Sequence, residues 1–143
     1  MPRIHRELGV SYAPEQMYQL VNNVECYPDF LPGCVSSRIL ERTHDSVSAS
    51  LSFAKGGMQK SFSTKNTLMP PNKIEMSLLE GPFKHLKGVW EFIAMPSGAC
   101  RVVLDLEFEF ANRILSMMFG PVFHHVAQSM VGSFCQQAEA VYA

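Results

Sequence analysis

Charged residues and long apolar runs are both scarce in this sequence. Only 17% of its 143 residues are charged, whereas 47% are hydrophobic, and this balance excludes disordered chains and coiled coils, which carry many more charges. No run reaches the roughly 18 apolar residues that a membrane-spanning helix needs, and the opening segment MPRIHRELGV lacks the apolar core of a signal peptide. We therefore expect a cytoplasmic protein in which residues 1–143 form one domain, near the usual size of about 150 residues.

Catalytic motifs and cysteines are scarce as well. The chain contains no G-x-S-x-G elbow, dinucleotide fingerprint, Walker loop or H-E-x-x-H motif. His124 and His125 are neighbours on a predicted helix and would point about 100° apart, so they cannot bind one metal together. We predict no catalytic residue, no metal site and no required cofactor. The cysteines follow no zinc-ligand spacing, and we expect them to be reduced and buried: Cys26, Cys34, Cys100 and Cys135.

Charge is distributed unevenly along the chain, although the net charge is only -1. All six lysines lie between Lys55 and Lys87, where there are only two acids, Glu75 and Glu80. Such a basic stretch attracts phosphates or anionic head groups, but dispersed lysines are also typical of a solvated surface, and both interpretations stay open here. Three acids share a strand face opposite large apolar side chains, which favours a solvated face over an acid–base pair: Asp105, Glu107 and Glu109.

A period of two predicts seven strands. Residues 3–12 alternate apolar and polar side chains, as a half-buried strand does; a helix is expected to begin at Pro14, and a short helical turn near Pro28. Glycine and proline turns separate six further alternating segments: 35–43, 46–54, 58–69, 73–79, 85–95 and 99–110. The short links between these segments indicate antiparallel neighbours.

A long amphipathic helix is expected at the C-terminal end. Its N-cap is Asn112, and Gly120-Pro121 should break or kink its first part. Its apolar stripe is Phe123, Val126, Ala127, Met130, Val131, Phe134, Ala138 and Val141. The order of strand, helices, six strands and helix predicts an α+β domain in which this stripe packs on the dry faces of the strands. The ten Phe and nine Met residues either fill a solid core or line a hollow, and composition leaves both open.

Four segments carry a family resemblance: YPDFLPGC (27–34), LLEGPFKHLKGVWEF (78–92), LDLEFEFAN (104–112), and FGPVF with SMVGSFCQQAEAVY (119–142). They resemble the START-like coenzyme Q-binding family, also described as polyketide cyclase/lipid transport-like, and most closely its bacterial branch of ribosome association toxins. The resemblance implies a helix-grip fold, in which a curved seven-stranded antiparallel sheet wraps a long C-terminal helix and encloses an elongated apolar cavity.

The resemblance also implies a ligand, ubiquinone or a similar isoprenoid lipid, and a role in respiratory electron transport. Burial of a polyprenyl tail contributes roughly 0.8 kcal/mol per methylene. The residues expected to line the cavity are Trp90, Phe92, Leu104, Leu106, Phe108, Phe123, Met130 and Phe134. The residues expected at a mobile mouth are Phe30, Leu31, Phe83, Met117, Met118 and Phe119. Such a carrier would contact the inner face of a membrane transiently.

A second function implied by the resemblance is that of a toxin that binds the large ribosomal subunit and blocks subunit association. The lysines expected to contact ribosomal RNA are Lys55, Lys60, Lys65, Lys84 and Lys87. Because a cavity and an outer face are different surfaces, both functions can belong to one protein, and no DNA partner is expected. A third function, a polyketide cyclase-like enzyme, is disfavoured because the dry strand faces hold almost no titratable group.

Overall fold

The computed structural model describes residues 3–55 and 57–142, and the side chains of Lys55 and Met58 lie outside the description. Along the chain the elements are β1 (Arg3–Val10), α1 (Pro14–Asn22), a 3-10 turn (Val24–Cys26), α2 (Tyr27–Phe30), β2 (Cys34–Arg42), β3 (Ser46–Lys55), β4 (Met58–Met69), β5 (Lys73–Glu80), β6 (Phe83–Ala94), a second 3-10 turn (Pro96–Gly98), β7 (Cys100–Phe110) and α3 (Arg113–Tyr142). Each strand lies within two residues of its predicted bounds, so the α+β class and the element order are confirmed. No helix in the described ranges has the length and apolar character that spanning a bilayer requires.

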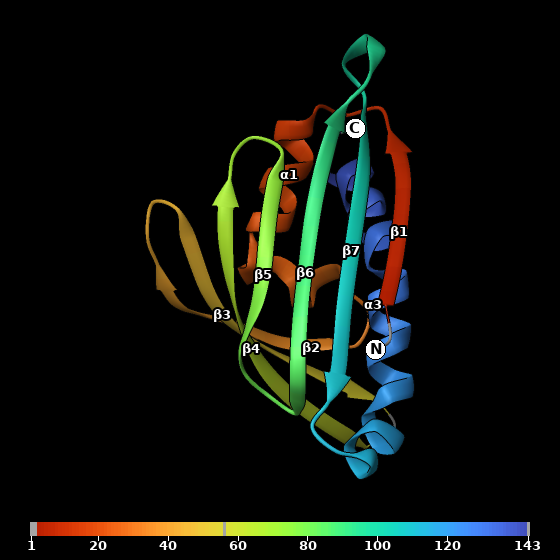
Figure 1. Ribbon diagram of the computed structural model, residues 1–143. Helices are drawn as coiled ribbons and strands as arrows, with labels where there is room; N and C mark the ends of the chain where they lie inside the picture. The colour runs from red at the N-terminus through yellow and green to blue at the C-terminus, as the bar shows by residue number, and fades with distance from the viewer. Residues whose placement is uncertain (1–2, 56, 143) are drawn as a thin grey trace.

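The seven strands form one antiparallel sheet in the order β1-β7-β6-β5-β4-β3-β2. Neighbours in sequence pair from β2 through β7, while β1 pairs with β7, which joins the first strand to the last. Figure 1 shows β5, β6, β7 and β1 standing side by side along α3, while β2, β3 and β4 slant away from them. The sheet is therefore strongly curved around α3, as the helix-grip fold requires.

Alternation of side chains gives the sheet one apolar face. In β7, Val102, Leu104 and Leu106 are buried, whereas Asp105 and Glu107 point to the outer face. In β3, serines alternate with buried apolar residues in the same way. A period of two places every second side chain on the same side of a strand, and the predicted dry faces are confirmed.

Register shifts interrupt the strand pairing at four places. A bulge bends the strand that carries it and increases the local twist, so these irregularities help the sheet to curve around α3. Two of them lie in β2, one between β4 and β5 and one between β6 and β7, at residues 34/36, 39/41, 63/64 and 83/85.

Polar side chains satisfy backbone groups at the first turns of both long helices. The backbone N–H of Ala13 donates to Oε1 of Gln16 at 2.8 Å, so half of a capping box forms although alanine offers no capping oxygen. The N–H of Leu115 donates to Oδ1 of Asn112 at 2.9 Å, which confirms Asn112 as the N-cap of α3.

Helix α3 continues through Pro121. Of the break or kink expected at Gly120-Pro121, the break does not occur, since one helix extends from Arg113 to Tyr142. Pro121 is exposed, so water can solvate the Met117 carbonyl that a proline leaves without a helical donor. The buried stripe of α3 ends at Ala138, because Val141 is exposed.

Candidate functional site

One part of the space between the sheet and α3 is packed solid. Phe92, Leu104 and Phe134 are each at most 1% exposed, and the Phe134 ring meets that of Trp90 edge to face with 5.3 Å between centroids. Helix α1 covers this part, since the Tyr18 ring packs against Phe92 at 6.1 Å. We call it the packed region (Tyr18, Phe92, Leu104 and Phe134).

A cavity of about 50 Å³ lies farther along the same interior. It is bounded by the inner faces of β3 to β7, by α3 and by the segment that precedes β2. Its lining consists of Val24, Tyr27, Ala49, Leu51, Phe53, Phe62, Thr64, Asn66, Met76, Leu86, Trp90, Leu106, Phe123, Val126, Ala127 and Met130. At this size it has room for only a few water molecules, so a larger guest requires its walls to move. We call the residues that line this cavity the hollow region.

Only some of the predicted lining residues border the cavity. Four of the eight border the cavity: Trp90, Leu106, Phe123 and Met130. The other four are buried elsewhere in the interior: Phe92, Leu104, Phe108 and Phe134. The structure therefore brings all eight into one interior, and their role in ligand binding stays a prediction.

Gly88 leaves space for two side chains that line the cavity, because it has no side chain of its own. A Cβ at this position would lie 2.6 Å from the Met76 methyl carbon and 2.9 Å from Cδ1 of Leu106. Met76 and Leu106 both line the cavity. Because Gly88 has no side chain, they pack against its Cα and do not extend into the cavity. A side chain at position 88 would push them toward the cavity.

Two polar side chains interrupt the apolar lining. Thr64 and Asn66 lie on the inner face of β4, each 6% exposed, and Oγ1 of Thr64 donates a hydrogen bond to Oδ1 of Asn66 at 3.2 Å. A third polar group, the Tyr27 hydroxyl, donates to the Val21 carbonyl, and burial raises its pKa. The sequence does not single out Thr64 or Asn66, because β4 carries polar residues on both faces and alternation cannot identify the inner one.

A second hollow, of about 30 Å³, lies beside the cavity. It contains two predicted mouth residues, and its lining is Phe53, Lys60, Phe62, Pro82, Phe83, Phe110, Phe119, Val122 and Phe123. Phe53, Phe62 and Phe123 border both spaces, with the Phe62 centroid 5.7 Å from that of Phe53 and 5.9 Å from that of Phe123. We call this hollow the mouth and these three rings the aromatic gate.

The other predicted mouth residues do not line this hollow. Met117 and Met118 lie on the first turns of α3 just before Phe119, and they are 73% and 46% exposed. Phe30 packs against Phe134 in the packed region, and Leu31 is buried. With Ile114, the two methionines form an exposed apolar surface at the start of α3 (Ile114, Met117 and Met118).

The lysines are spread over separate parts of the described surface. Lys60 lies at the mouth, with Nζ 5.6 Å from the centre of the Phe119 ring. Lys84 pairs with Glu109, with 3.9 Å between Nζ and Oε2. The side chain of Lys55 lies outside the described residues. The remaining two predicted RNA contacts are exposed on the outer face of the sheet: Lys65 and Lys87.

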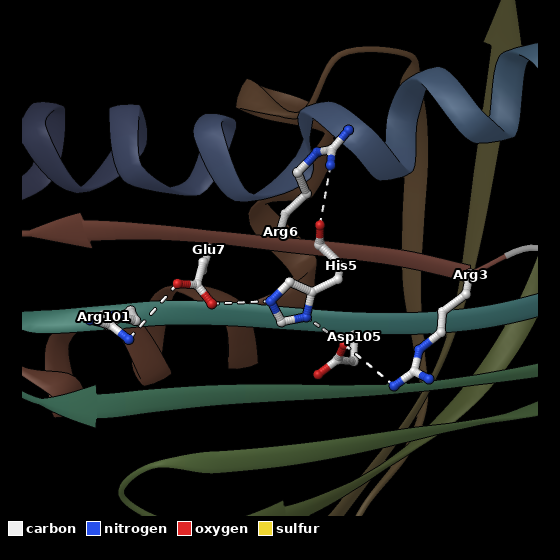
Figure 2. A network of polar contacts seen from close by, with 6 residues as sticks. All are labelled: Arg3, His5, Arg6, Glu7, Arg101 and Asp105. Atoms are coloured by element: carbon white, nitrogen blue, oxygen red, sulfur yellow. Dashed lines mark hydrogen bonds and ion pairs between the residues drawn. The ribbon is translucent and has the colours of Figure 1, made fainter.

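A polar network covers the outer face where β1 meets β7 (Figure 2). His5 lies between two carboxylates, with Nδ1 2.6 Å from Asp105 and Nε2 3.0 Å from Glu7. Arg3 lies 3.9 Å from Asp105, and Arg101 lies 3.8 Å from Glu7. Hydrogen bonds to Asp105 and Glu7 raise the pKa of His5. The network faces solvent, away from the cavity.

The cysteines are free thiols, and three of the four are buried: Cys34, Cys100 and Cys135. Burial raises the pKa of Cys34 and of Cys135 to about 11, which keeps both protonated at neutral pH. Cys26, at the end of the 3-10 turn before α2, is only half-buried, and this corrects the expectation that all four are buried. In the described part of the chain, no three His, Cys, Asp or Glu side chains gather closely enough to hold a metal ion.

Sequence comparisons agree with the family resemblance. The family described as "Polyketide cyclase / dehydrase and lipid transport" matches residues 10–135. The chain is 47% identical to the persistence and stress-resistance toxin PasT of Escherichia coli O6:H1 and 46% identical to the ribosome association toxin RatA of Escherichia coli K12, each over 100% of this chain and 90% of the relative. It is 29% identical to the mitochondrial coenzyme Q-binding protein coq10 of Schizosaccharomyces pombe, over 90% of this chain and 81% of that protein.

Solved structures share the fold. The Zhui aromatase/cyclase from Streptomyces sp. R1128 matches with a TM-score of 0.84 and 18% identity, over 96% of this chain and 93% of that one. A START superfamily protein from Mycobacterium smegmatis matches with a TM-score of 0.70 and 19% identity, over 94% of this chain and 98% of that one. At such low identity the likeness shows the fold alone, and the predicted helix-grip fold is confirmed.

Proposed function

We propose that this chain, which belongs to the Polyketide cyclase / dehydrase and lipid transport family, binds an isoprenoid quinone between its sheet and α3. The observation that carries this proposal is the apolar cavity, which the aromatic gate and the mouth continue toward the surface. The relationship to coq10, a coenzyme Q-binding protein, supports ubiquinone as the ligand. The lipid transport in the family's description supports a hydrophobic ligand in general.

The hollow region must expand to admit such a ligand, because a cavity of about 50 Å³ is much smaller than a quinone ring. Two methionines in the lining, Met76 and Met130, are unbranched and adapt easily to irregular apolar shapes. Each buried methylene contributes roughly 0.8 kcal/mol, so a few isoprene units offset the displacement of several side chains. We therefore expect ligand entry to widen the cavity by rotation of these side chains and of the gate rings.

A quinone carrier collects its ligand from a membrane. The exposed apolar surface at the start of α3 directly precedes Phe119, which lines the mouth, and Lys60 adds a positive charge at the mouth. Apolar side chains beside a cation suit the boundary between acyl chains and anionic head groups. We propose that the mouth contacts the inner face of the cytoplasmic membrane transiently and that the protein supports respiratory electron transport.

Organic extraction of the purified protein tests the proposed ligand. We expect mass spectrometry of the extract to detect ubiquinone or another isoprenoid quinone, and delipidated protein to take up added short-chain ubiquinone. An unrelated protein of similar size, purified in parallel, sets the background. Extracts that repeatedly lack quinone and lipid, together with no uptake, would reject the proposal.

Association with the large ribosomal subunit is a second candidate function. The 46% identity to RatA, a ribosome association toxin, over the whole of this chain favours it. Exposed lysines such as Lys65 and Lys87 would contact RNA phosphates, and such contacts make binding steeply salt-dependent. These lysines lie on the outer face of the sheet, so the second function does not compete with the cavity for residues.

Sedimentation of a cell lysate through a sucrose gradient tests this second function. We expect the chain to comigrate with large subunits at low salt, to dissociate as salt rises, and to bind more weakly when Lys65 and Lys87 are both changed to Ala. Lys73→Ala is the matched control, because Lys73 is not among the predicted RNA contacts and lies 3.9 Å from Glu75. No comigration at low salt, with unchanged subunit association on overexpression, would reject this function.

A cyclase-like enzyme has less support. The aromatase/cyclase shares only the fold. Among the described residues, the cavity lining holds one titratable side chain, Tyr27, whose hydroxyl bonds to the Val21 carbonyl and whose pKa is raised by burial. General acid–base catalysis needs a group whose pKa lies near the working pH. The lining therefore favours binding over catalysis.

A further inference from the structure

Strand β4 carries the distinctive residues of the interior in a fixed order. Every second residue along its inner face gives Lys60 at the mouth, Phe62 in the aromatic gate, and then Thr64 and Asn66 in the cavity. A strand rises about 3.3 Å per residue, so Asn66 lies roughly 13 Å from Phe62 along β4. The strand thus passes from a charged entrance through an apolar gate to a polar pair inside.

Asn66 has a buried amide group that the protein engages on one side only. The side chain is 6% exposed and borders the cavity opposite Met76. Its Oδ1 accepts a hydrogen bond from Thr64. No group in the described part of the chain accepts a hydrogen bond from its Nδ2. Asn66 borders the cavity, so an acceptor that enters the cavity can take the hydrogen bond that no described protein group takes from Nδ2.

We propose that Asn66 anchors the polar head of the ligand, which enters head first and leaves its isoprenoid tail in the aromatic gate and the mouth. The Nδ2 of Asn66 donates a hydrogen bond to a ring carbonyl oxygen, while Thr64 holds the amide in position through Oδ1. The inference rests on the proposed function and adds two properties to it. The ligand carries a hydrogen-bond-accepting oxygen on its head, and that head lies in the cavity.

The opposite orientation would lose the hydrogen bond inside the cavity. A tail in the cavity would leave Nδ2 of Asn66 without a partner, and a carbonyl head at the mouth could accept only from Lys60, whose side chain is exposed to water there. The head-first orientation forms one buried hydrogen bond and places apolar carbon against apolar rings. It therefore also favours a quinone over a plain hydrocarbon of the same length.

Two matched ligands separate the anchor from general apolar binding. Decylubiquinone has carbonyl oxygens on its ring, and decylbenzene has the same alkyl length without them; displacement of the apolar dye N-phenyl-1-naphthylamine reports on both. We expect Asn66→Leu to weaken decylubiquinone roughly tenfold, the effect of one buried hydrogen bond, and to leave decylbenzene unchanged or tighter. Thr64→Val should weaken decylubiquinone by a smaller factor. Met130→Leu, a volume-conserving change in the apolar lining, is the control and should affect both ligands alike.

The infrared carbonyl stretch of bound decylubiquinone provides a second readout that does not depend on stability. A hydrogen bond to the carbonyl oxygen lowers its stretching frequency. We expect a lower frequency in wild-type protein than in Asn66→Leu, with Thr64→Val between them and Met130→Leu equal to wild type.

The outcomes distinguish the anchor from the proposed function. If Asn66→Leu weakens both ligands equally, or keeps the wild-type preference for the quinone, the anchor is overturned and the proposed function stands. If wild-type protein binds neither ligand, the proposed function fails and the anchor fails with it. If Asn66→Leu does not fold, Thr64→Val decides the question, and a carbonyl frequency identical to wild type would overturn the anchor.

Discussion

The packed and hollow regions share one sheet and one helix, yet the cavity of about 50 Å³ lies in the hollow region. In the packed region α1 lies over the sheet, and Tyr18 closes on Phe92. No residue of α1 borders the cavity, where side chains of the sheet face α3 directly. Figure 1 shows α1 near one end of the sheet and the start of α3 at the other. The short helix α1 therefore determines which part of the sheet's apolar face is fully packed.

Stability and binding space consequently depend on different residues. Fully buried rings such as Phe92 and Phe134 stabilise the packed region. In the hollow region Gly88 and Met76 set the cavity's size, and Asn66 sets its polarity. Substitutions in the two regions should therefore change different measurements.

The largest expected effect is the loss of stability in Phe134→Ala. Because Phe134 is fully buried against Trp90 and Tyr27, we expect the free energy of unfolding to fall by about 3–5 kcal/mol in urea titrations. Phe123→Ala is the matched control in the hollow region; it is only half-buried and borders existing space, so its loss should be clearly smaller. Equal losses would mean that the two regions are packed alike.

The next effect separates binding from stability. In Gly88→Ala the added methyl group should push Met76 and Leu106 into the cavity, so we expect the affinity for decylubiquinone to fall several-fold, by roughly 1 kcal/mol. The free energy of unfolding should change little, because the closest contact is the flexible end of Met76. Gly132→Ala, on α3 with open space around it, is the control: stability should rise by about 0.5–1 kcal/mol and affinity should not change. Unchanged affinity in Gly88→Ala would contradict the assigned role of Gly88.

A smaller effect is expected at the surface beside the mouth. The double variant Met117→Ser/Met118→Ser should slow the transfer of quinone from vesicles a few-fold, because it removes apolar area from the proposed membrane contact. Its stability should stay within about 0.5 kcal/mol of wild type, since both residues are exposed. Ile93→Ser alters an exposed apolar residue that does not border the mouth. If this control slows transfer equally, the contact is not at the mouth.

The smallest expected effect lies on the outer face, away from both regions. Hydrogen bonds to Asp105 and Glu7 raise the pKa of His5, so the charged imidazole stabilises the folded state. This contribution is complete below the pKa that His5 has in the unfolded chain, and it is lost as pH rises through the higher pKa of His5 in the folded protein. We expect wild type to be slightly more stable than His5→Gln at about pH 5.5 and equal to it at about pH 9, with quinone affinity unaffected at either pH. A stability difference that grows with rising pH would have the wrong sign.

The fold could be predicted from the sequence because its signals are local. The alternation from Cys100 to Phe110 identifies a strand and its buried face, and Gly81-Pro82 marks where one strand ends and the next begins. The break expected at Pro121 does not occur, because an exposed helix position tolerates the lost hydrogen bond.

The site could be predicted only in part, because its shape depends on contacts between distant segments. Alternation places Phe92 and Leu106 on the apolar face of the sheet. It does not reveal that Tyr18 covers Phe92, whereas Leu106 borders a cavity. Asn66 is missed for a different reason. It lies in a strand with polar residues on both faces, where no pattern identifies the inner one.

The most direct test uses Trp90, the single tryptophan of the chain, which is buried and borders the cavity. A quinone that enters the hollow region must come close to this ring and quench its fluorescence. In a titration with decylubiquinone we expect saturable quenching that ends at one ligand per chain and shifts to higher concentration in Gly88→Ala. Quenching that rises linearly without saturation, as for a free tryptophan derivative, would contradict a binding site in the interior.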